Sequence, residues 1–160
     1  MQIQAKPLYN EYTITKNQTA KDIAGAIVKS IRDSEETAKM LAPLIKSNNK
    51  MQTLKNIFTF CKNNVTYKKE GKDLQTAKTI NRILAEKYGD CKHMSTVCYA
   101  ICKALNIPCK LRLISQSLFN ADPTHIYCIA YVNGNLVVID PVLDSFNKEA
   151  KYFYKYDIKA

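Results

Sequence analysis

Apolar residues in the first half of the chain recur at the three- and four-residue spacing of helices. Thr19, followed three residues later by Asp22, resembles a capping box, and an amphipathic pattern begins directly after it. A second helical pattern follows Ser34, and a third begins at Met51. Residues 1–18 are polar and unpatterned, so we expect them to form an arm or an edge strand. This half therefore predicts helical packing.

Two more helices are predicted in the second half. A short one is expected near Ile80–Glu86, and a longer one from Cys91 to Leu105, where apolar residues keep a 3.6-residue period. The segment Asn106-Ile107-Pro108 ends this helix, because the residue before a proline is pushed out of the helical region. The long helix therefore leads into the last third of the chain.

Extended segments dominate that last third. Asn133-Gly134 is a strong signal for a two-residue hairpin loop between two of them. The tail at 151–156 alternates aromatic and charged residues and is expected to add an edge strand. Helices that lead into antiparallel strands predict an α+β fold. The three predicted strands are Cys109–Ser115, His125–Val132 and Leu136–Ile139.

Length and composition are those of one globular domain. The chain has 160 residues, 46% hydrophobic and 24% charged, so we expect a single domain over 1–160, with a mainly helical part at 1–70 and a core at 71–160. No stretch approaches the roughly 18–20 apolar residues of a membrane span, and the first residues lack the apolar core of a signal peptide. We therefore expect a cytoplasmic protein without membrane contact, whose six cysteines are thiols.

The net charge of +10 has the sign that nucleic-acid binding requires, because basic surfaces neutralise phosphates. Only three of the 24 basic residues are Arg, however, and base and phosphate recognition favours the planar Arg side chain. The lysines are also spread along the chain, with no run longer than Lys68-Lys69. A nucleic-acid partner is therefore not expected.

Cys91 stands where the long helix is predicted to begin. Gly89 permits a tight turn before it and Asp90 is a typical N-cap residue, which makes Cys91 the first helical residue. Backbone N–H groups and the positive end of the helix dipole favour thiolate over thiol at such a position. The same N–H groups can donate to an oxyanion on a bound carbonyl. The position fits either a nucleophile or a half-buried cysteine behind an ordinary cap.

A thiol nucleophile also needs a base, and the chain has two histidines. His93 lies two residues after Cys91 on the same helix, so the two side chains point about 200° apart and cannot meet. We therefore expect His93 at the surface or behind the site. His125 opens a predicted strand and is free to face the helix, which makes it the candidate base.

Hairpin geometry supplies a third candidate. A two-residue loop at Asn133-Gly134 sets Asp140 opposite Tyr127 and His125 opposite Val142. Asp140 and His125 are then diagonal neighbours on one face, about 7–8 Å apart. An Asp in this place can orient the imidazole and fix its tautomer. The plainer alternative is an Asp that only starts a turn, but an unpaired carboxylate beside the core is costly and favours a partnered role.

Six cysteines and two histidines also call for a test of metal binding. Four candidate ligands share the long predicted helix but lack the C-x-x-C spacing of structural zinc sites. They are Cys91, His93, Cys98 and Cys102. Two of them, Cys98 and Cys102, lie on the apolar stripe, where small buried cysteines are common. We therefore expect no metal and no other cofactor.

Four segments together resemble the transglutaminase-like family of papain-like thiol enzymes. They are Tyr88–His93, Ala104–Cys109, Thr124–Tyr127 and Val138–Pro141. Members of the family have Gly-Asp-Cys before a helix, an exit with small residues and Pro, a His at a strand start, and an Asp that ends the next strand. The resemblance covers about residues 72–145 and includes the order Cys, His, Asp.

The resemblance implies a papain-like fold in which the helix of the nucleophile packs on an antiparallel sheet. It also implies an acyl-enzyme mechanism, in which Cys91 attacks an amide or ester carbonyl, His125 transfers the proton and Asp140 holds His125. Relatives often carry a Gln before the cysteine as an oxyanion donor, and Gln75 stands at the matching place.

The function implied is that of a cysteine protease or amidase acting on a protein or peptide substrate. The chain has no Trp, and Lys92-His93 follows the cysteine where cross-linking transglutaminases carry an aromatic residue, which favours hydrolysis over cross-linking. Standalone domains of this kind resemble bacterial and phage members, for which a virion location is the alternative to the cytoplasm. The alternative function is a non-catalytic binding or structural module, such as a virion or assembly component.

Overall fold

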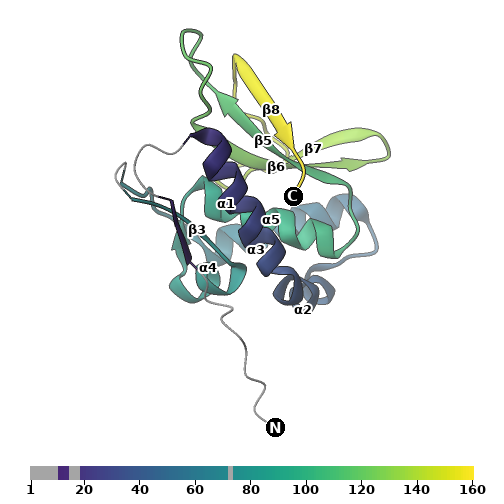
Figure 1. Cartoon of the computed structure of the whole chain (residues 1–160). Helices are drawn as coiled ribbons and strands as arrows, with labels where there is room; N and C mark the ends of the chain where they lie inside the picture. The colour runs from purple at the N-terminus through teal and green to yellow at the C-terminus, as the bar shows by residue number, and fades with distance from the viewer. Residues whose placement is uncertain (1–10, 15–18, 72–73) are drawn as a thin grey trace.

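Helix α5 (Cys91–Ala104) runs through the middle of the molecule, between a four-stranded sheet and the other helices (Figure 1). The computed structural model describes residues 11–14, 19–71 and 74–160. Every residue of α5 from Lys92 to Cys102 is buried, because the helices cover the side that the sheet leaves open. The other helices are α1 (Ala20–Asp33), α2 (Glu35–Ile45), α3 (Lys50–Asn64) and α4 (Ile80–Glu86).

The first two helices begin where the sequence predicts, but for different reasons. Thr19 and Asp22 form the expected capping box, with the Asp22 amide donating to Thr19 Oγ1 at 3.2 Å. Ser34 precedes α2 without capping it. Its hydroxyl donates to the Ser30 carbonyl at 2.6 Å and accepts from the Ile80 amide at 2.9 Å. Ser34 therefore ties the end of α1 to the start of α4.

The main sheet is antiparallel, with the strand order β7-β6-β5-β8. Asn133 and Gly134 adopt positive φ angles of 52° and 78°, as a tight hairpin loop requires. Cys128 pairs with Ile139 across this hairpin, so the register predicted from the sequence is confirmed. The strands are β5 (Cys109–Ser115), β6 (His125–Val132), β7 (Asn135–Ile139) and β8 (Tyr154–Ile158). The last of them is the predicted edge strand, which begins three residues later than expected and pairs with β5.

Two short strand pairs flank the start of α5. An antiparallel pair joins β1 (Glu11–Ile14) to β3 (Gln75–Lys78), and a parallel pair joins β2 (Thr66–Tyr67) to β4 (Tyr88–Gly89). The sequence did not predict β3, and the prediction of an arm or edge strand for residues 1–10 and 15–18 falls outside the described residues. The second pair brings β2, distant in sequence, next to Gly89, and β3 contacts α5 itself.

Among the residues that the structure describes, no helix is long and apolar enough to cross a lipid bilayer.

Candidate active site

Cys91 is the first residue of α5, as predicted, and its side chain is half-buried. The carboxylate of Asp90 caps the helix by accepting from the amides of Lys92, at 3.0 Å, and His93. Among the described residues, the amide of Cys91 has no hydrogen-bond acceptor. The thiol thus lies at a helix N-terminus whose first amide can still bind an oxygen atom.

Gly89 is required by close packing rather than by a left-handed turn. It lies in β4 without a positive φ angle. A Cβ atom added there would lie 2.6 Å from Cβ of His93, closer than real side chains approach. The predicted reason for this glycine is therefore wrong, and the actual one is the ring of His93 packed against its backbone.

His125 and Asp140 meet as the hairpin register predicts. Nε2 of His125 lies 2.7 Å from Oδ2 of Asp140, whose other oxygen accepts from the Val142 amide at 3.2 Å. The Cys91 thiol lines the same cavity as the imidazole and lies near enough to influence its charge. Because Nε2 faces the carboxylate, Nδ1 is the ring nitrogen left for the sulfur. The structure therefore brings Cys91, His125 and Asp140 together.

The charge of His125 is set by these two neighbours. Burial alone lowers the pKa of the imidazole, because it penalises the charged form. The hydrogen bond with Asp140, and the negative charges of Asp140 and of the Cys91 thiolate, outweigh burial and raise the pKa to about 9. His125 is therefore protonated near neutral pH, which is the form that pairs with a cysteine thiolate.

Ser95 ties the helix of the thiol to the strand of the imidazole. Its hydroxyl lies 2.6 Å from the carbonyl oxygen of Cys91 and 3.0 Å from that of Ile126, the residue after His125. A bond shared between these two carbonyls fixes the start of α5 against β6. The distance between the thiol and the base thus depends on a short contact in the core.

A second network supports His125 from the sheet. The ring of Tyr127 lies 5.4 Å from that of His125, and its hydroxyl donates to Oε1 of Glu149 at 2.6 Å. Buried Arg112 bonds the same Glu149 oxygen at 2.7 Å and also pairs with Asp157. Burial and the hydrogen bond with Glu149 raise the pKa of Tyr127. The ring beside His125 is therefore held in place and uncharged.

Gln75 of β3 lines the same cavity as Cys91 and His125. Its Oε1 accepts from Nζ of Lys92 at 2.7 Å, and its Nε2 donates to the carbonyl of Gly71 at 3.0 Å. These bonds fix which end of the amide is the nitrogen and leave it one further N–H. The structure thus brings the fourth predicted residue to the site, and its catalytic role stays a prediction.

Lys92, buried next to Cys91, is a residue whose place sequence reasoning missed. Its ammonium lies 2.5 Å from Oδ2 of Asp90 and 3.3 Å from Oε1 of Glu70, in addition to the bond with Gln75. Burial favours the neutral form of Asp90, but the neighbouring His93 and Lys92 outweigh it and lower the pKa of this carboxyl far below its usual range. No motif in the sequence marks Glu70, so this cluster was not predictable.

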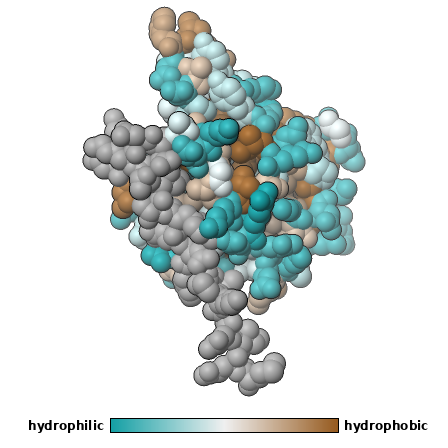
Figure 2. Space-filling model, viewed as in Figure 1, coloured by the Kyte–Doolittle hydropathy of each residue, from teal (hydrophilic) through white to brown (hydrophobic). Residues whose placement is uncertain are grey.

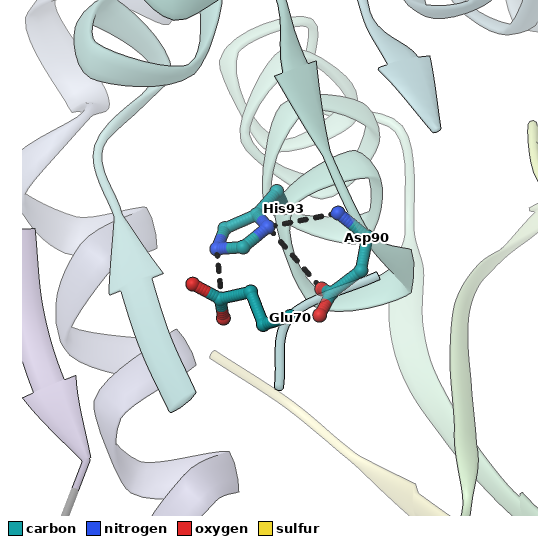
Figure 3. A group of neighbouring side chains, drawn as sticks. All are labelled: Glu70, Asp90 and His93. Carbon is teal, nitrogen blue, oxygen red and sulfur yellow. Dashed lines mark hydrogen bonds and ion pairs between the residues drawn. The ribbon is translucent and has the colours of Figure 1, made fainter. Parts of the chain in front are cut away.

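His93 is buried behind the helix start, the second of the two places expected for it. Figure 3 shows its ring between Glu70 and Asp90. Nδ1 accepts from the Asp90 amide at 2.9 Å, so the ring proton belongs on Nε2, which lies 3.0 Å from the Thr76 carbonyl. The imidazole thus holds β3 against the start of α5.

Glu70, Asp90 and His93 are close enough together to be considered as metal ligands. The ammonium of Lys92 already bonds both carboxylates, and Nδ1 of His93 accepts a hydrogen bond from the Asp90 amide. A fixed internal cation therefore stands in the place of a metal ion. The cysteines considered for zinc, Cys98 and Cys102, are fully buried in the hydrophobic core.

Comparisons with known proteins show the family and the fold of the chain. Residues 39–141 match the family described as the transglutaminase-like superfamily. A candidate protease from Parabacteroides distasonis superposes with a TM-score of 0.60 and 16% identity, over 75% of this chain and 26% of that one. A candidate cysteine protease from Cytophaga hutchinsonii gives 0.53 and 20%, over 82% and 48%. The chain thus spans less than half of either solved protein. No curated protein matches its sequence.

Proposed function

The chain belongs to the transglutaminase-like superfamily, and from this premise we propose that it is a thiol hydrolase that cleaves an amide bond in a protein or peptide. The observation that carries the proposal is that His125 bonds Asp140 and shares a cavity with Cys91. A half-buried imidazole that is held by a carboxylate beside a thiol at a helix N-terminus is the arrangement that nucleophilic cysteine chemistry needs.

The proposed reaction begins with the proton of Cys91 on His125. The Cys91 sulfur attacks the substrate carbonyl carbon, a C–S bond forms, and the carbonyl electron pair moves onto oxygen. When the tetrahedral intermediate collapses, the C–N bond breaks and His125 gives its proton to the departing amine. Water then attacks the thioester, loses a proton to His125, and releases the carboxylic acid and the thiol. Asp140 keeps the imidazole oriented throughout.

Two donors are proposed to bind the developing oxyanion. One is the amide of Cys91, which lacks an acceptor among the described residues, and the other is the remaining N–H on Nε2 of Gln75. They come from the start of α5 and from β3, on the same cavity. Donors fixed before the reaction stabilise charge that develops only in the transition state, which raises the rate without tightening substrate binding.

A second accessible cysteine, Cys109, must be replaced before the proposal is tested, because its thiol can also react with the acyl donor. Only Cys91 and Cys109 are half-buried, and the other four cysteines are buried. The neighbouring thiols of Cys102 and Cys128 lower the pKa of Cys109, so this thiol can compete for an acylating reagent. We therefore choose the Cys109→Ser protein as the background for all assays.

The deciding experiment uses p-nitrophenyl acetate as an acyl donor. We expect a burst of nitrophenolate, an acetyl group on Cys91 by mass spectrometry, and slower hydrolysis of the thioester. Cys91→Ala and His125→Ala should both abolish the burst. A peptide mixture digested by the protein, with Cys91→Ala as the control, should then show new termini.

The opposite outcome is equally informative. If Cys91 is acetylated no faster than the remaining thiols, and His125→Ala changes nothing, the protein is not a thiol hydrolase. The binding or assembly module is then the better assignment for this fold.

A further inference from the structure

One wall of the cavity beside Cys91 is aliphatic. Helix α1 contributes Ala20, Ile23 and Ile27, which lie one turn apart along a single stripe. The sheet contributes Leu113 and Ile126, which are direct partners across β5 and β6. Ile126, Cys91 and His125 line the same cavity, so the apolar wall shares that cavity with the reacting groups.

The size of the cavity suits a single side chain. Its volume is about 180 Å³. Pockets that enclose a whole drug-sized ligand are larger, roughly 300–1,000 Å³. Figure 2 shows hydrophobic patches in the middle of the face that α1 crosses, between hydrophilic side chains, apart from the hydrophobic tip of the β5–β6 loop. A short aliphatic group on the carbonyl of a substrate would fill this space.

The polar wall opposite offers little to a charged group. Glu70 and Asp90 both bond the ammonium of Lys92, and that ammonium also bonds Oε1 of Gln75. Charges that are already paired with one another gain little from a charged ligand, whereas the ligand would lose its hydration. Lys69 also lines the cavity, but it is exposed to solvent, where an ion pair contributes little. The cavity therefore discriminates mainly by apolar contact.

We propose that this cavity is the acyl subsite of the enzyme and that it takes amides or esters whose carbonyl carries a short aliphatic group, of about the size of a valine or leucine side chain. The inference rests on the proposed function, because it assumes that Cys91 is acylated. It assigns a task to α1, whose residues Ile23 and Ile27 form the wall that faces the sheet.

The test is a series of p-nitrophenyl esters on the Cys109→Ser protein, from acetate through butyrate to hexanoate, with the succinate monoester as the charged member. Acylation rates of Cys91 are divided by those of free N-acetylcysteine, which removes differences in ester reactivity. Each methylene buried in an apolar site gains about 0.8 kcal/mol, which is about fourfold in rate. We expect a rise of about that size per methylene until the cavity is full, and the slowest relative acylation with the succinate ester.

A variant in the wall makes the test specific. Ile23→Gln should reduce the butyrate-to-acetate ratio several-fold, because a polar amide replaces apolar surface in the cavity. The matched control is Val28→Gln, on the same helix and also half-buried but not in the cavity lining. The control should keep the ratio of the parent protein.

The proposed function and the aliphatic subsite can be overturned separately. If Cys91 is not acetylated selectively, the proposed function itself is wrong. If Cys91 is acetylated selectively but the relative rates are flat along the series, or the succinate ester reacts fastest, only the aliphatic subsite is overturned. An equal loss of chain-length preference in Ile23→Gln and Val28→Gln would also overturn it.

Discussion

Asp140 reaches His125 along a diagonal of the β6–β7 hairpin, with 2.7 Å between Oδ2 and Nε2. The pairing of Cys128 with Ile139 fixes this diagonal, because it sets Asp140 one position beyond the last paired residue of β7. The tight loop at the other end of the hairpin thus determines which carboxylate meets the imidazole. The same bond contributes to the raised pKa of His125.

Replacement of Asp140 by Asn should leave the imidazole without its anionic partner. An amide can donate to Nε2 and so favour the wrong tautomer, with the proton on the nitrogen that faces the thiol. We expect acylation of Cys91 by p-nitrophenyl acetate to fall on the order of 10²- to 10⁴-fold. Asp144→Asn, an exposed carboxylate four residues away, should keep the parent rate. Similar rates in both variants would remove Asp140 from the mechanism.

Because of the charge of His125, the free energy of unfolding should fall as the pH rises. The folded pKa of about 9 lies above the ordinary 6.5, so the stabilisation is fully present below pH 6.5 and is lost as the pH rises through 9. The difference in unfolding free energy between the parent and His125→Asn should shrink by roughly 3 kcal/mol over this window. Urea denaturation followed by circular dichroism between pH 6 and 10 measures it. A difference that is constant with pH would contradict the raised pKa.

The sequence was most informative where local rules determine the geometry. The hairpin at Asn133-Gly134 requires positive φ angles that these residue types accept, so register and the His125–Asp140 pair follow from it. Asp90 caps α5 as its residue type predicts, which places Cys91 at the first position of the helix. These parts of the site depend on neighbours in the sequence or across one tight turn.

Long-range contacts explain what the sequence could not provide. Glu70 lies twenty residues before Asp90 in a segment without a motif, and it reaches the site only because β2 pairs with β4. The apolar period of α5 predicted one buried face, but α1, α2 and α3 cover the other side, so polar residues such as Lys92 and Thr96 are buried too. Burial of this kind depends on which elements pack together, and a periodicity within one helix cannot reveal it.

Lys92 provides a direct test of the buried charge cluster. Lys92→Met keeps the length of the side chain but leaves the carboxylates of Asp90 and Glu70 without their cation. Removal of one partner from a buried ion pair destabilises proteins by about 3–5 kcal/mol, so we expect a loss of this order. Lys39→Met, which breaks an exposed pair with Glu35, should change stability far less. Equal effects of the two substitutions would show that the cluster contributes no more than a surface pair.

Because Gly89 packs closely against His93, we expect alanine substitutions at two glycines to change stability in opposite directions. In Gly89→Ala the new methyl group would lie 2.6 Å from Cβ of His93, in a buried site where neither backbone can move freely. We expect a loss of about 1–3 kcal/mol, the usual cost of overpacking, and weaker acylation of Cys91 because the helix start shifts. Gly25→Ala is the control, since a Cβ there meets nothing within 4 Å and the position lies inside α1.

For Gly25→Ala we expect a gain of about 0.5–1 kcal/mol, because alanine favours the helix and restricts the unfolded chain. Urea denaturation measures the change in unfolding free energy of both variants, and the acylation assay is run on the same proteins. Two stabilised proteins would mean that His93 does not pack against Gly89 as described. If Gly89→Ala is destabilised but keeps the parent acylation rate, the contact stabilises the fold without positioning the thiol of Cys91.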